Sequence, residues 1–241
     1  TPAWIAVAAA AVLTPVALAS RASSALFWFR YVAGDDGRTV FLFLDRVGLF
    51  YTGFALGQLI GVLVAASLAR RFDKAHLIIV AGIIEVAAIS AFHLMPVDAV
   101  WPQTAAQVFV GVGLGMMMML AYSMFTDIAE YLEWSTKRQM TGLAVSGAVF
   151  AVKTGVAIGA ALPGLLFALT GFEAGAVQTA DARLGIDLAF AIVPAAIIIP
   201  AGVAMLFYKL DRRTIAHFEG ELAQRRMQSV PTPFPSPPET L

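Results

Sequence analysis

The chain has 241 residues, of which 59% are hydrophobic and 13% are charged, whereas a soluble domain is about half apolar and about a quarter charged. Its sixteen basic and sixteen acidic residues cancel, so no net charge favours nucleic acid as a partner. The sequence has no cysteine and only three histidines, far apart in the chain, which excludes a disulfide framework and leaves no metal-ligand spacing. We therefore expect a membrane protein with no metal site and no cofactor.

Six stretches of the chain are long and apolar enough to cross a lipid bilayer as helices. A hydrocarbon core of about 30 Å needs about 20 mostly apolar residues per helix, and only helices and closed barrels satisfy every backbone polar group in lipid. Because none of the stretches alternates like a membrane β-strand, we predict an all-α membrane protein with six transmembrane helices. The predicted spans are residues 4–32, 47–68, 76–95, 102–125, 140–169 and 185–208.

Basic residues gather in alternate connections between the predicted spans. Arg70, Arg71 and Lys74 lie in the second connection, and Lys137 and Arg138 lie in the fourth. The tail after residue 208 is also basic, whereas the remaining connections are mainly acidic. Because short cytoplasmic loops carry an excess of lysine and arginine, we expect a multi-pass protein of the cell inner membrane with both ends in the cytoplasm.

Glycines recur four residues apart within three of the predicted spans. Such stripes of small residues let helix backbones approach closely in lipid, where the usual hydrophobic drive between helices is missing. We therefore assign these glycines to helix packing rather than to substrate binding. The glycines concerned are Gly53, Gly57 and Gly61, then Gly111 and Gly115, and finally Gly155 and Gly159.

The end of the chain departs from the composition of the spans. Residues 210–228 place Ile215, Phe218 and Leu222 at helical spacing beside basic residues, a pattern typical of a helix lying on an anionic cytoplasmic membrane face. Residues 229–241 hold five prolines and are expected to be disordered or extended. The predicted organisation is a helical bundle over residues 1–209, an amphipathic helix over 210–228 and a proline-rich tail over 229–241.

Three charged side chains lie deep within the predicted spans, where a charge usually faces a cavity or a partner. Lys153 is expected to serve a substrate, a coupling-ion site or a gating carboxylate, or to form a structural ion pair. Arg21 is expected to bind a carboxylate or to pair with an acid in the half of the protein that this sequence lacks. Glu85 has no partner that the sequence identifies.

A dense charged segment, "TDIAEYLEWSTKRQMTG", follows the fourth predicted span. Its carboxylates and aromatic residues fall at helical spacing on one face, and two basic residues follow them. This pattern predicts a cytoplasmic gate that forms and breaks ion pairs with another domain. A solvated loop end that obeys the positive-inside rule is the alternative, and the pattern alone does not separate the two. The predicted gate residues are Asp127, Glu130, Tyr131, Trp134, Lys137 and Arg138.

An ordered set of motifs runs from this segment to residue 185. An Asp-x-x-Glu-Tyr-x-Glu-Trp block is followed by a Gly, by Phe-x-x-Lys-x-Gly in the penultimate span, and then by Gly-Phe, a Gln and Leu-Gly. These motifs comprise Asp127, Glu130, Tyr131, Glu133, Trp134, Gly142, Phe150, Lys153, Gly155, Gly171, Phe172, Gln178 and Gly185. Together with "SRASSALFWFRYVAG", "SLARRFDKAH" and "YKLDRRTIAHFEGEL", the set resembles the glycoside-pentoside-hexuronide:cation symporter family over nearly the whole chain.

The resemblance implies a major-facilitator fold with twelve helices, of which these are the seventh to twelfth, and alternating access between two six-helix bundles. A chain that starts at Thr1 is then expected to begin inside a longer protein. The resemblance places most of the Na⁺ or H⁺ site, and most sugar contacts, in the N-terminal bundle. One departure is that the positions around Lys153 expected to face the cavity, namely Ala148, Val149 and Val152, are less polar than a sugar site requires.

We therefore predict the C-terminal half of a secondary active transporter for a sugar, glycoside or hexuronide, not an enzyme. The predicted substrate or cavity residues are Lys153, Arg21, Val149, Tyr122 and Met118. The alternatives are a transporter of an amphipathic or lipid-like solute and a non-catalytic six-helix membrane subunit. An intramembrane enzyme would need a nucleophile or metal constellation, and the sequence contains neither.

Overall fold

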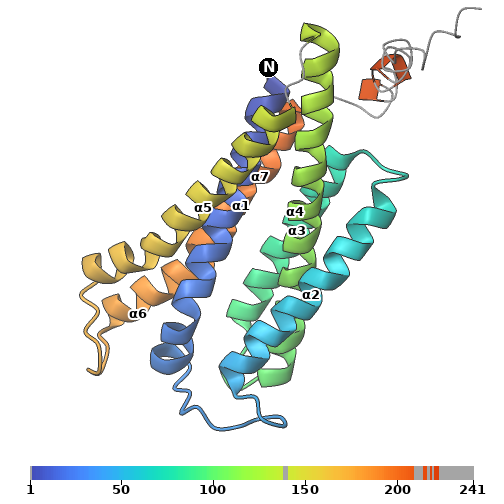
Figure 1. Ribbon diagram of the computed structural model, residues 1–241. Coiled ribbons are helices and arrows are strands. Elements are labelled where there is room, and N and C mark those ends of the chain that lie inside the picture. Colours follow the sequence, from blue (N-terminus) through green and yellow to red (C-terminus); the bar gives the residue numbers. More distant parts are fainter. Residues whose placement is uncertain (1, 138–140, 209–213, 216–217, 219, 223–241) are drawn as a thin grey trace, which may run out of the picture.

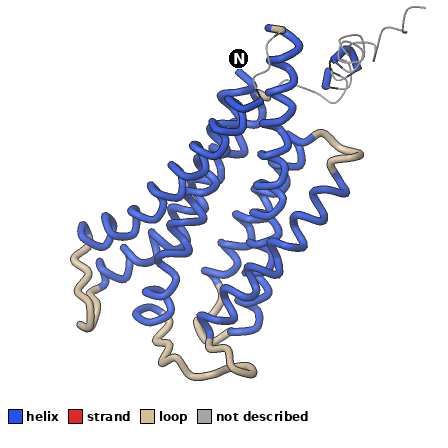
Figure 2. The backbone as a smooth tube through the Cα atoms, in the orientation of Figure 1, coloured by secondary structure: helices blue, strands red, loops and turns tan. Residues whose placement is uncertain are grey.

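The described residues of the chain form a bundle of helices (Figures 1 and 2). The computed structural model describes residues 2–137, 141–208, 214–215, 218 and 220–222. Within this part, the only strand-like pairing is one isolated bridge between Phe41 and Leu44. The predicted all-α fold with six candidate membrane spans is therefore confirmed.

Five of the six spans are built on one long helix each. These helices are α1, Pro2–Phe27, which continues as a π-helical turn Trp28–Val32, then α2, Arg46–Leu68, α3, Lys74–Leu94, α4, Val100–Thr136, and α5, Thr141–Leu169. The sixth span is composite, with α6, Ala180–Asp187, a π-helical turn Leu188–Ile192, α7, Val193–Ala204, and a 3-10 turn Met205–Phe207. The prediction ended the fourth span at residue 125, whereas α4 continues through the polar segment to Thr136.

The helices form two groups of three, which Figure 1 shows side by side. One group comprises α2, α3 and α4, and the other comprises α1, α5 and the α6–α7 span. In chain order the spans divide into two segments, one from α1 to α3 and one from α4 to α7. The first helix of each segment packs against the second and third spans of the other segment: α1 on α5 and α7, and α4 on α2 and α3. Since each segment holds an odd number of spans, the second is inverted relative to the first, as in an inverted repeat.

The predicted glycine stripes lie where helices approach most closely. A Cβ added to Gly57 or Gly61 in α2 would overlap the backbone of α4 at Val108 or Val112. A Cβ added at Gly155 or Gly159 in α5 would likewise overlap the α1 carbonyls of Val12 and Val16, and Gly111 and Gly115 in α4 face the α2 carbonyls of Phe54 and Gln58. The prediction that these glycines serve helix packing is confirmed, and both segments use the same device.

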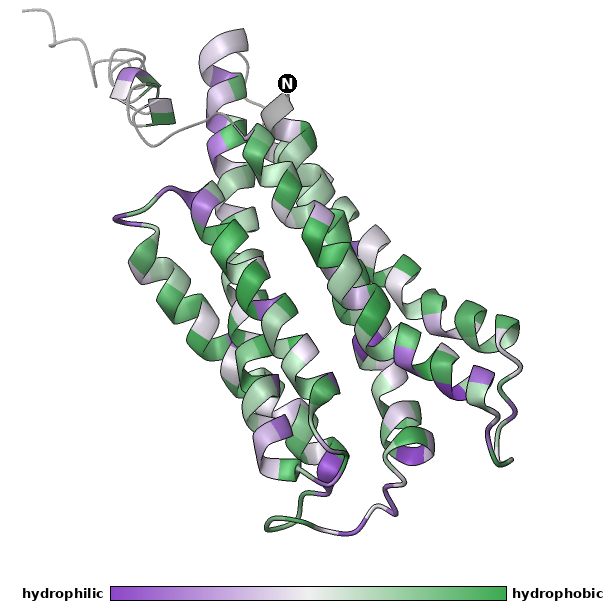
Figure 3. Cartoon of the chain, turned by 180° about the vertical axis from the view of Figure 1, so that it is seen from behind, coloured by the Kyte–Doolittle hydropathy of each residue, from purple (hydrophilic) through white to green (hydrophobic). Residues whose placement is uncertain are grey.

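The outer surface of the bundle is suited to lipid. Figure 3 shows hydrophobic residues along the helices, with most of the strongly hydrophilic ones in the connections and at helix ends. Large apolar side chains are exposed in mid-helix, for example Leu59 at 61% and Ile83 at 64%. Exposed apolar surface on this scale would be unfavourable in water, so the described helices belong in a bilayer.

We expect Gly57→Ala to lower the thermal stability of the purified protein. The added Cβ would push α2 away from Val108, and overpacking of this kind typically costs about 1–3 kcal/mol. Gly164→Ala in α5 is the matched control, because its Cβ would meet nothing within 4 Å. Thermal unfolding in detergent, followed by intrinsic fluorescence, measures both midpoints. Equal midpoints for the two variants would contradict the close approach of α2 and α4.

The orientation of the bundle in the membrane is tested by cysteine labelling. Ser135 and Asp98 are exposed at opposite ends of α4, and this stretch of chain has no native cysteine. If the basic connections are cytoplasmic, Asp98→Cys should react with a membrane-impermeant maleimide in intact cells, whereas Ser135→Cys should react only after lysis. The reverse pattern would overturn the predicted orientation.

Candidate functional site

Arg21 of α1 lies at the centre of the bundle and is only 3% exposed. Its Nη1 donates to the carbonyl of Phe190 at 2.7 Å, and its Nη2 donates to Gln107 Oε1 at 2.9 Å. The guanidinium carbon also lies 4.2, 5.0 and 5.4 Å from the ring centroids of Phe190, Phe92 and Phe50. A planar guanidinium is suited to this combination of fixed hydrogen bonds and stacking on aromatic faces.

A proline in the last span explains why a carbonyl is available to Arg21. In a continuous α-helix, residue 194 would donate to Phe190 O, but Pro194 has no N–H. Through the π-helical turn, Val193 N–H donates to Leu188 O instead of to Ala189 O. The carbonyls of Ala189 and Phe190 are thus both without their α-helical donors, and α1 supplies replacements. Ser20 Oγ donates to Ala189 O at 2.9 Å, beside the bond from Arg21 to Phe190 O.

Glu85 of α3 faces this cluster. It is 3% exposed, and its carboxylate interacts electrostatically with Arg21. Its Oε2 and Arg21 Nε are buried without a hydrogen-bond partner in the described part of the chain. We expected Arg21 to bind a carboxylate or to pair with an acid in the half of the protein that this sequence lacks, and we identified no partner for Glu85. The structure shows that the two face each other across α1 and α3, with Gln107 contributed by α4.

A cavity of about 420 Å³ leads to these three polar side chains. Arg21, Glu85 and Gln107 form its buried end, since each is at most 3% exposed. Most of the remaining wall is apolar and comes from α1, α2 and α4. Tyr51 of α2 and Val156 of α5, each 41% exposed, mark its outer part. Ligand sites commonly have this form, in which a mostly apolar wall surrounds a few convergent polar groups.

Lys153 is exposed near the middle of α5. It shares its exposed face with Val149 at 46%, as the sequence predicted, and with Phe150 at 73%. Ala148 was expected to face the cavity, but it is 2% exposed and lies inside the bundle, because it is on the opposite side of α5. Within the described residues Lys153 forms no ion pair with Glu85, the buried carboxylate of the cavity, so Lys153 and the buried polar cluster are separate features of the site.

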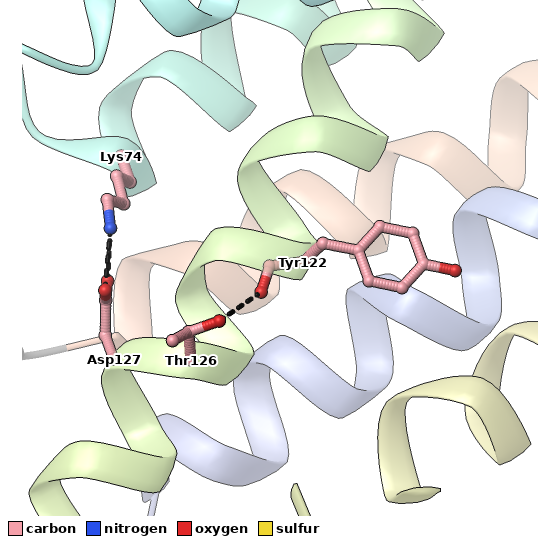
Figure 4. Close-up of polar contacts among 4 residues, drawn as sticks. All are labelled: Lys74, Tyr122, Thr126 and Asp127. Carbon is pink, nitrogen blue, oxygen red and sulfur yellow. Dashed lines mark hydrogen bonds and ion pairs between the residues drawn. The ribbon is translucent and has the colours of Figure 1, made fainter. Parts of the chain in front are cut away.

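The two predicted cavity residues of α4 lie one helical turn apart. Met118 is half-buried and Tyr122 is 45% exposed. In Figure 4 the ring of Tyr122 points away from the start of α3 and toward α1. No contact among the described residues tests whether Met118 and Tyr122 line a substrate cavity, so this role remains a prediction.

Asp127 forms an ion pair within the bundle. Lys74 Nζ lies 2.6 and 2.7 Å from the two carboxylate oxygens of Asp127, and Figure 4 shows the lysine reaching from the start of α3 to α4. The side chains are 20% and 7% exposed, respectively, so the pair is largely shielded from water. The sequence assigned Lys74 only to membrane orientation and expected Lys137 and Arg138 to be the basic members of the gate.

Of the other predicted gate residues, Glu130, Tyr131 and Trp134 lie in the last turns of α4, which is helical as predicted. Tyr131 packs on Trp134, with ring centroids 6.1 Å apart, and on Phe218, at 5.9 Å. Trp134 Nε1 donates to Glu221 Oε2 at 2.7 Å, while Glu130 is half-buried. Lys137 ends the helix in a left-handed conformation, with φ of 58°.

Some of the predictions fall partly or wholly outside the described residues. Arg138 lies outside them, as does the proline-rich segment 229–241. Of the predicted amphipathic helix over 210–228, residues 214–215, 218 and 220–222 are described and helical, and the assignment of the whole segment remains a prediction. Sequence reasoning also missed Gln107, although an amide side chain within an apolar span is a signal of a buried hydrogen bond.

Comparison with known proteins identifies the family. The family described as MFS/sugar transport protein matches residues 1–212. The chain belongs to the glycoside-pentoside-hexuronide:cation symporter family. This is a family of transporters rather than enzymes, and the six apolar helices agree with a multi-pass membrane protein.

Three similar proteins illustrate the range of the family. The glucuronide carrier protein homolog of Escherichia coli (strain K12) is 26% identical over 208 residues, which are 85% of this chain and 43% of that protein. The isoprimeverose transporter of Lactiplantibacillus pentosus is 24% identical, with 85% and 42% covered. The inner membrane symporter YicJ of Escherichia coli (strain K12) is 28% identical, with 74% and 40% covered. The chain therefore spans less than half the length of these relatives.

We expect the Lys74–Asp127 pair of this family member to show strong coupling. Asp127→Asn or Lys74→Met alone leaves a shielded charge without its partner, which typically costs about 3–5 kcal/mol. The double variant Lys74→Met with Asp127→Asn removes both charges and should cost less than the sum of the single changes. Thermal midpoints of the four proteins in detergent complete the cycle. Additive losses would show that the two side chains do not interact.

Proposed function

We propose that this chain forms the C-terminal six-helix half of a secondary active transporter. Its substrate is a sugar, glycoside or hexuronide, which moves together with Na⁺ or H⁺ across the inner membrane. The family match over residues 1–212 and the greater length of the relatives support this assignment. The partner is an N-terminal six-helix bundle that holds most of the cation site, and the two bundles alternate access to the substrate.

The observation that carries the proposal is the cavity that leads from the exposed face of α5 and α2 to Arg21, Glu85 and Gln107. Buried charged groups are rare in membrane spans, and they mark substrate or ion pathways by default.

Lys153 is proposed to face the partner bundle and the substrate. An exposed ammonium in the middle of a span is costly against lipid, so the face of α5 that carries it must be covered by protein, substrate or water. Val149 shares this face, and Met118 and Tyr122 of α4 complete the proposed wall on the neighbouring helix.

The Lys74–Asp127 pair is proposed to hold the cytoplasmic ends of α3 and α4 together as part of the gate. Both ends of the chain are then cytoplasmic, and Tyr131 and Trp134 extend the same surface. If the pair stabilises the closed cytoplasmic side, the single-charge variants of Lys74 and Asp127 should shift the full-length protein toward inward-open states.

A second candidate is transport of an amphipathic solute. The observation that favours it is the wall of the cavity, which is apolar except at its buried end. Uptake assays that compare sugars, glycosides and amphipathic solutes in one expression strain would separate the two candidates.

We expect Lys153→Met in the full-length protein to abolish coupled accumulation of substrate. Lys153→Arg should restore little of it, because the planar guanidinium does not replace a compact, mobile ammonium charge. Arg183→Met, which removes a positive charge from an exposed residue of α6, is the control and should retain uptake. Uptake of radiolabelled glycosides into cells measures all three variants. Wild-type accumulation by Lys153→Met would exclude Lys153 from transport.

A further inference from the structure

A second hollow, of about 390 Å³, forms a groove between α3 and α7. It is built only from aliphatic side chains and glycines, so its wall is apolar throughout. Large side chains at its rim are exposed, and an open groove of this composition is unfavourable against water. Its occupant in the membrane is therefore apolar. The exposed rim residues are Ile83 of α3 and Ile199, Val203 and Leu206 of the last span.

A glycine that helix packing does not explain keeps the groove open. A Cβ added at Gly57 or Gly61 would overlap the backbone of α4, whereas a Cβ added at Gly202 of α7 would meet nothing within 4 Å. Across the groove, a Cβ added at Gly82 of α3 would reach ordinary contact distance, 3.4 Å from Ile198 Cγ2. The missing side chain of Gly202 thus leaves room for a ligand rather than for a neighbouring helix.

The groove and the cavity open on opposite sides of the bundle. The helices α1 and α4 pack on each other, and α3 packs on α7 beside them, whereas α2 and α5 have no comparable contact. The cavity lies on the side of α2 and α5, where Tyr51 and Val156 mark its outer part and where Lys153 is exposed. With the partner bundle on that side, as proposed above, the groove is on the side that faces lipid.

The length of the groove matches one leaflet of a bilayer. Its wall on α3 runs from Ile79 to Ala87 and its wall on the last span runs from Ile198 to Leu206, which is about 12 Å at the helical rise of about 1.5 Å per residue. Half of a hydrocarbon core of about 30 Å is about 15 Å. Ile79 lies near the start of α3, and Leu206 lies in the turn that ends the last span. An acyl chain that enters between these ends extends to the middle of the bilayer.

The end of the groove at the membrane surface carries basic residues. His76 precedes Ile79 by three residues and therefore lies on the same side of α3, with its side chain 78% exposed. Arg70 and Arg71 are exposed in the connection before α3. Asp73, 3.7 Å from His76 Nδ1, is the one acidic residue in the stretch 70–76. Since basic residues at a membrane surface attract anionic lipids, this end favours a negative headgroup.

We propose that the groove binds an acyl chain of an anionic phospholipid, whose headgroup lies against Arg70, Arg71 and His76. The predicted orientation places this lipid in the cytoplasmic leaflet. Because α3 and α7 belong to different three-helix groups, the bound chain fills the gap between the groups on the side away from the substrate cavity. The site goes beyond the proposed transport function, since its ligand is a component of the membrane rather than the transported solute.

The test measures lipid binding to the purified full-length protein in detergent by native mass spectrometry. The probes are dioleoyl phosphatidylglycerol and dioleoyl phosphatidylcholine, which have the same acyl chains and differ in the charge of the headgroup. The wild-type protein should bind phosphatidylglycerol about tenfold more tightly, because only this lipid presents a net negative charge to the two arginines.

The groove itself is tested with a filling variant. Gly202→Leu places an aliphatic side chain in the open space and should weaken binding of phosphatidylglycerol about tenfold, because the acyl chain loses its apolar contacts. Gly164→Leu in α5 is the matched control, since a Cβ at Gly164 also meets nothing within 4 Å and lies outside the groove. It should bind phosphatidylglycerol like the wild type.

The headgroup contact is tested with a charge variant, which leaves the helices unchanged. Arg70→Gln with Arg71→Gln should weaken binding of phosphatidylglycerol about tenfold and leave binding of phosphatidylcholine unchanged. Arg38→Gln with Arg183→Gln removes two exposed arginines from other connections and should change neither. Equal affinity of the two double variants for phosphatidylglycerol would overturn the headgroup site even if Gly202→Leu failed to fold.

The remaining outcomes are equally decisive. Equal affinities of the wild type for the two lipids, or wild-type affinity of Gly202→Leu for phosphatidylglycerol, would overturn the proposal. A wild-type dimer that Gly202→Leu converts to a monomer without a change in lipid affinity would assign the groove to a second copy of the protein and overturn it as well. Lipid binding is measured without a transported solute, so a failure of uptake bears on the proposed function alone.

Discussion

Burial of the Arg21 guanidinium is the constraint on which the centre of this bundle depends. A charged side chain in an apolar interior is tolerated only when its donors are satisfied and a counter-charge is near. Arg21 meets this condition by bonding to two different helices, through Phe190 O and Gln107, with Glu85 from a third. The arginine thereby links α1 to α3, α4 and the last span, which belong to both three-helix groups.

A break in the helical hydrogen bonding of the last span makes this linkage possible. Pro194 and the π-helical turn before it leave carbonyl groups that the helix does not use, and unsatisfied carbonyls inside a membrane protein are costly. Ser20 and Arg21 are adjacent in α1 and meet two adjacent carbonyls. The break in one helix and the polar residues of the other are therefore one feature, because Ser20 and Arg21 donate to the carbonyls that the break leaves free.

The inverted repeat explains where the cavity lies. Glycines bring α2 against α4 and α5 against α1 until their backbones touch, so these pairs leave no space between them. No comparable stripe joins α1 to α2, which lie in different three-helix groups. The cavity forms there, between two tightly packed units, and Tyr51 bridges its outer part.

The sequence predicted what depends on local pattern and missed what depends on pairing between distant helices. Apolar length located the six spans, and glycine spacing identified the contacts of α2 and α5. Hydropathy ended α4 too early, because the helix continues as a polar structure beyond the apolar window until Lys137 adopts a left-handed conformation. Counting positive charges gave Lys74 a role in membrane orientation only, because its proximity to Asp127 is created by the fold. Glu85 lacked a visible partner for the same reason, since Arg21 is far away in sequence.

The two basic residues inside the spans have opposite environments, and the chemistry of each explains its place. Arg21 is enclosed by fixed acceptors and aromatic rings, which suit a planar group with several donors and hold it in one position. Lys153 stands on an exposed face with apolar neighbours, where a flexible chain with a compact charge can change partners. In the proposed transporter the two cations would serve different needs: Arg21 keeps this half rigid, and the contacts of Lys153 would differ between the two states. The helix bundle therefore assigns stability to Arg21 and leaves Lys153 on an exposed face, where the proposed partner bundle would cover it.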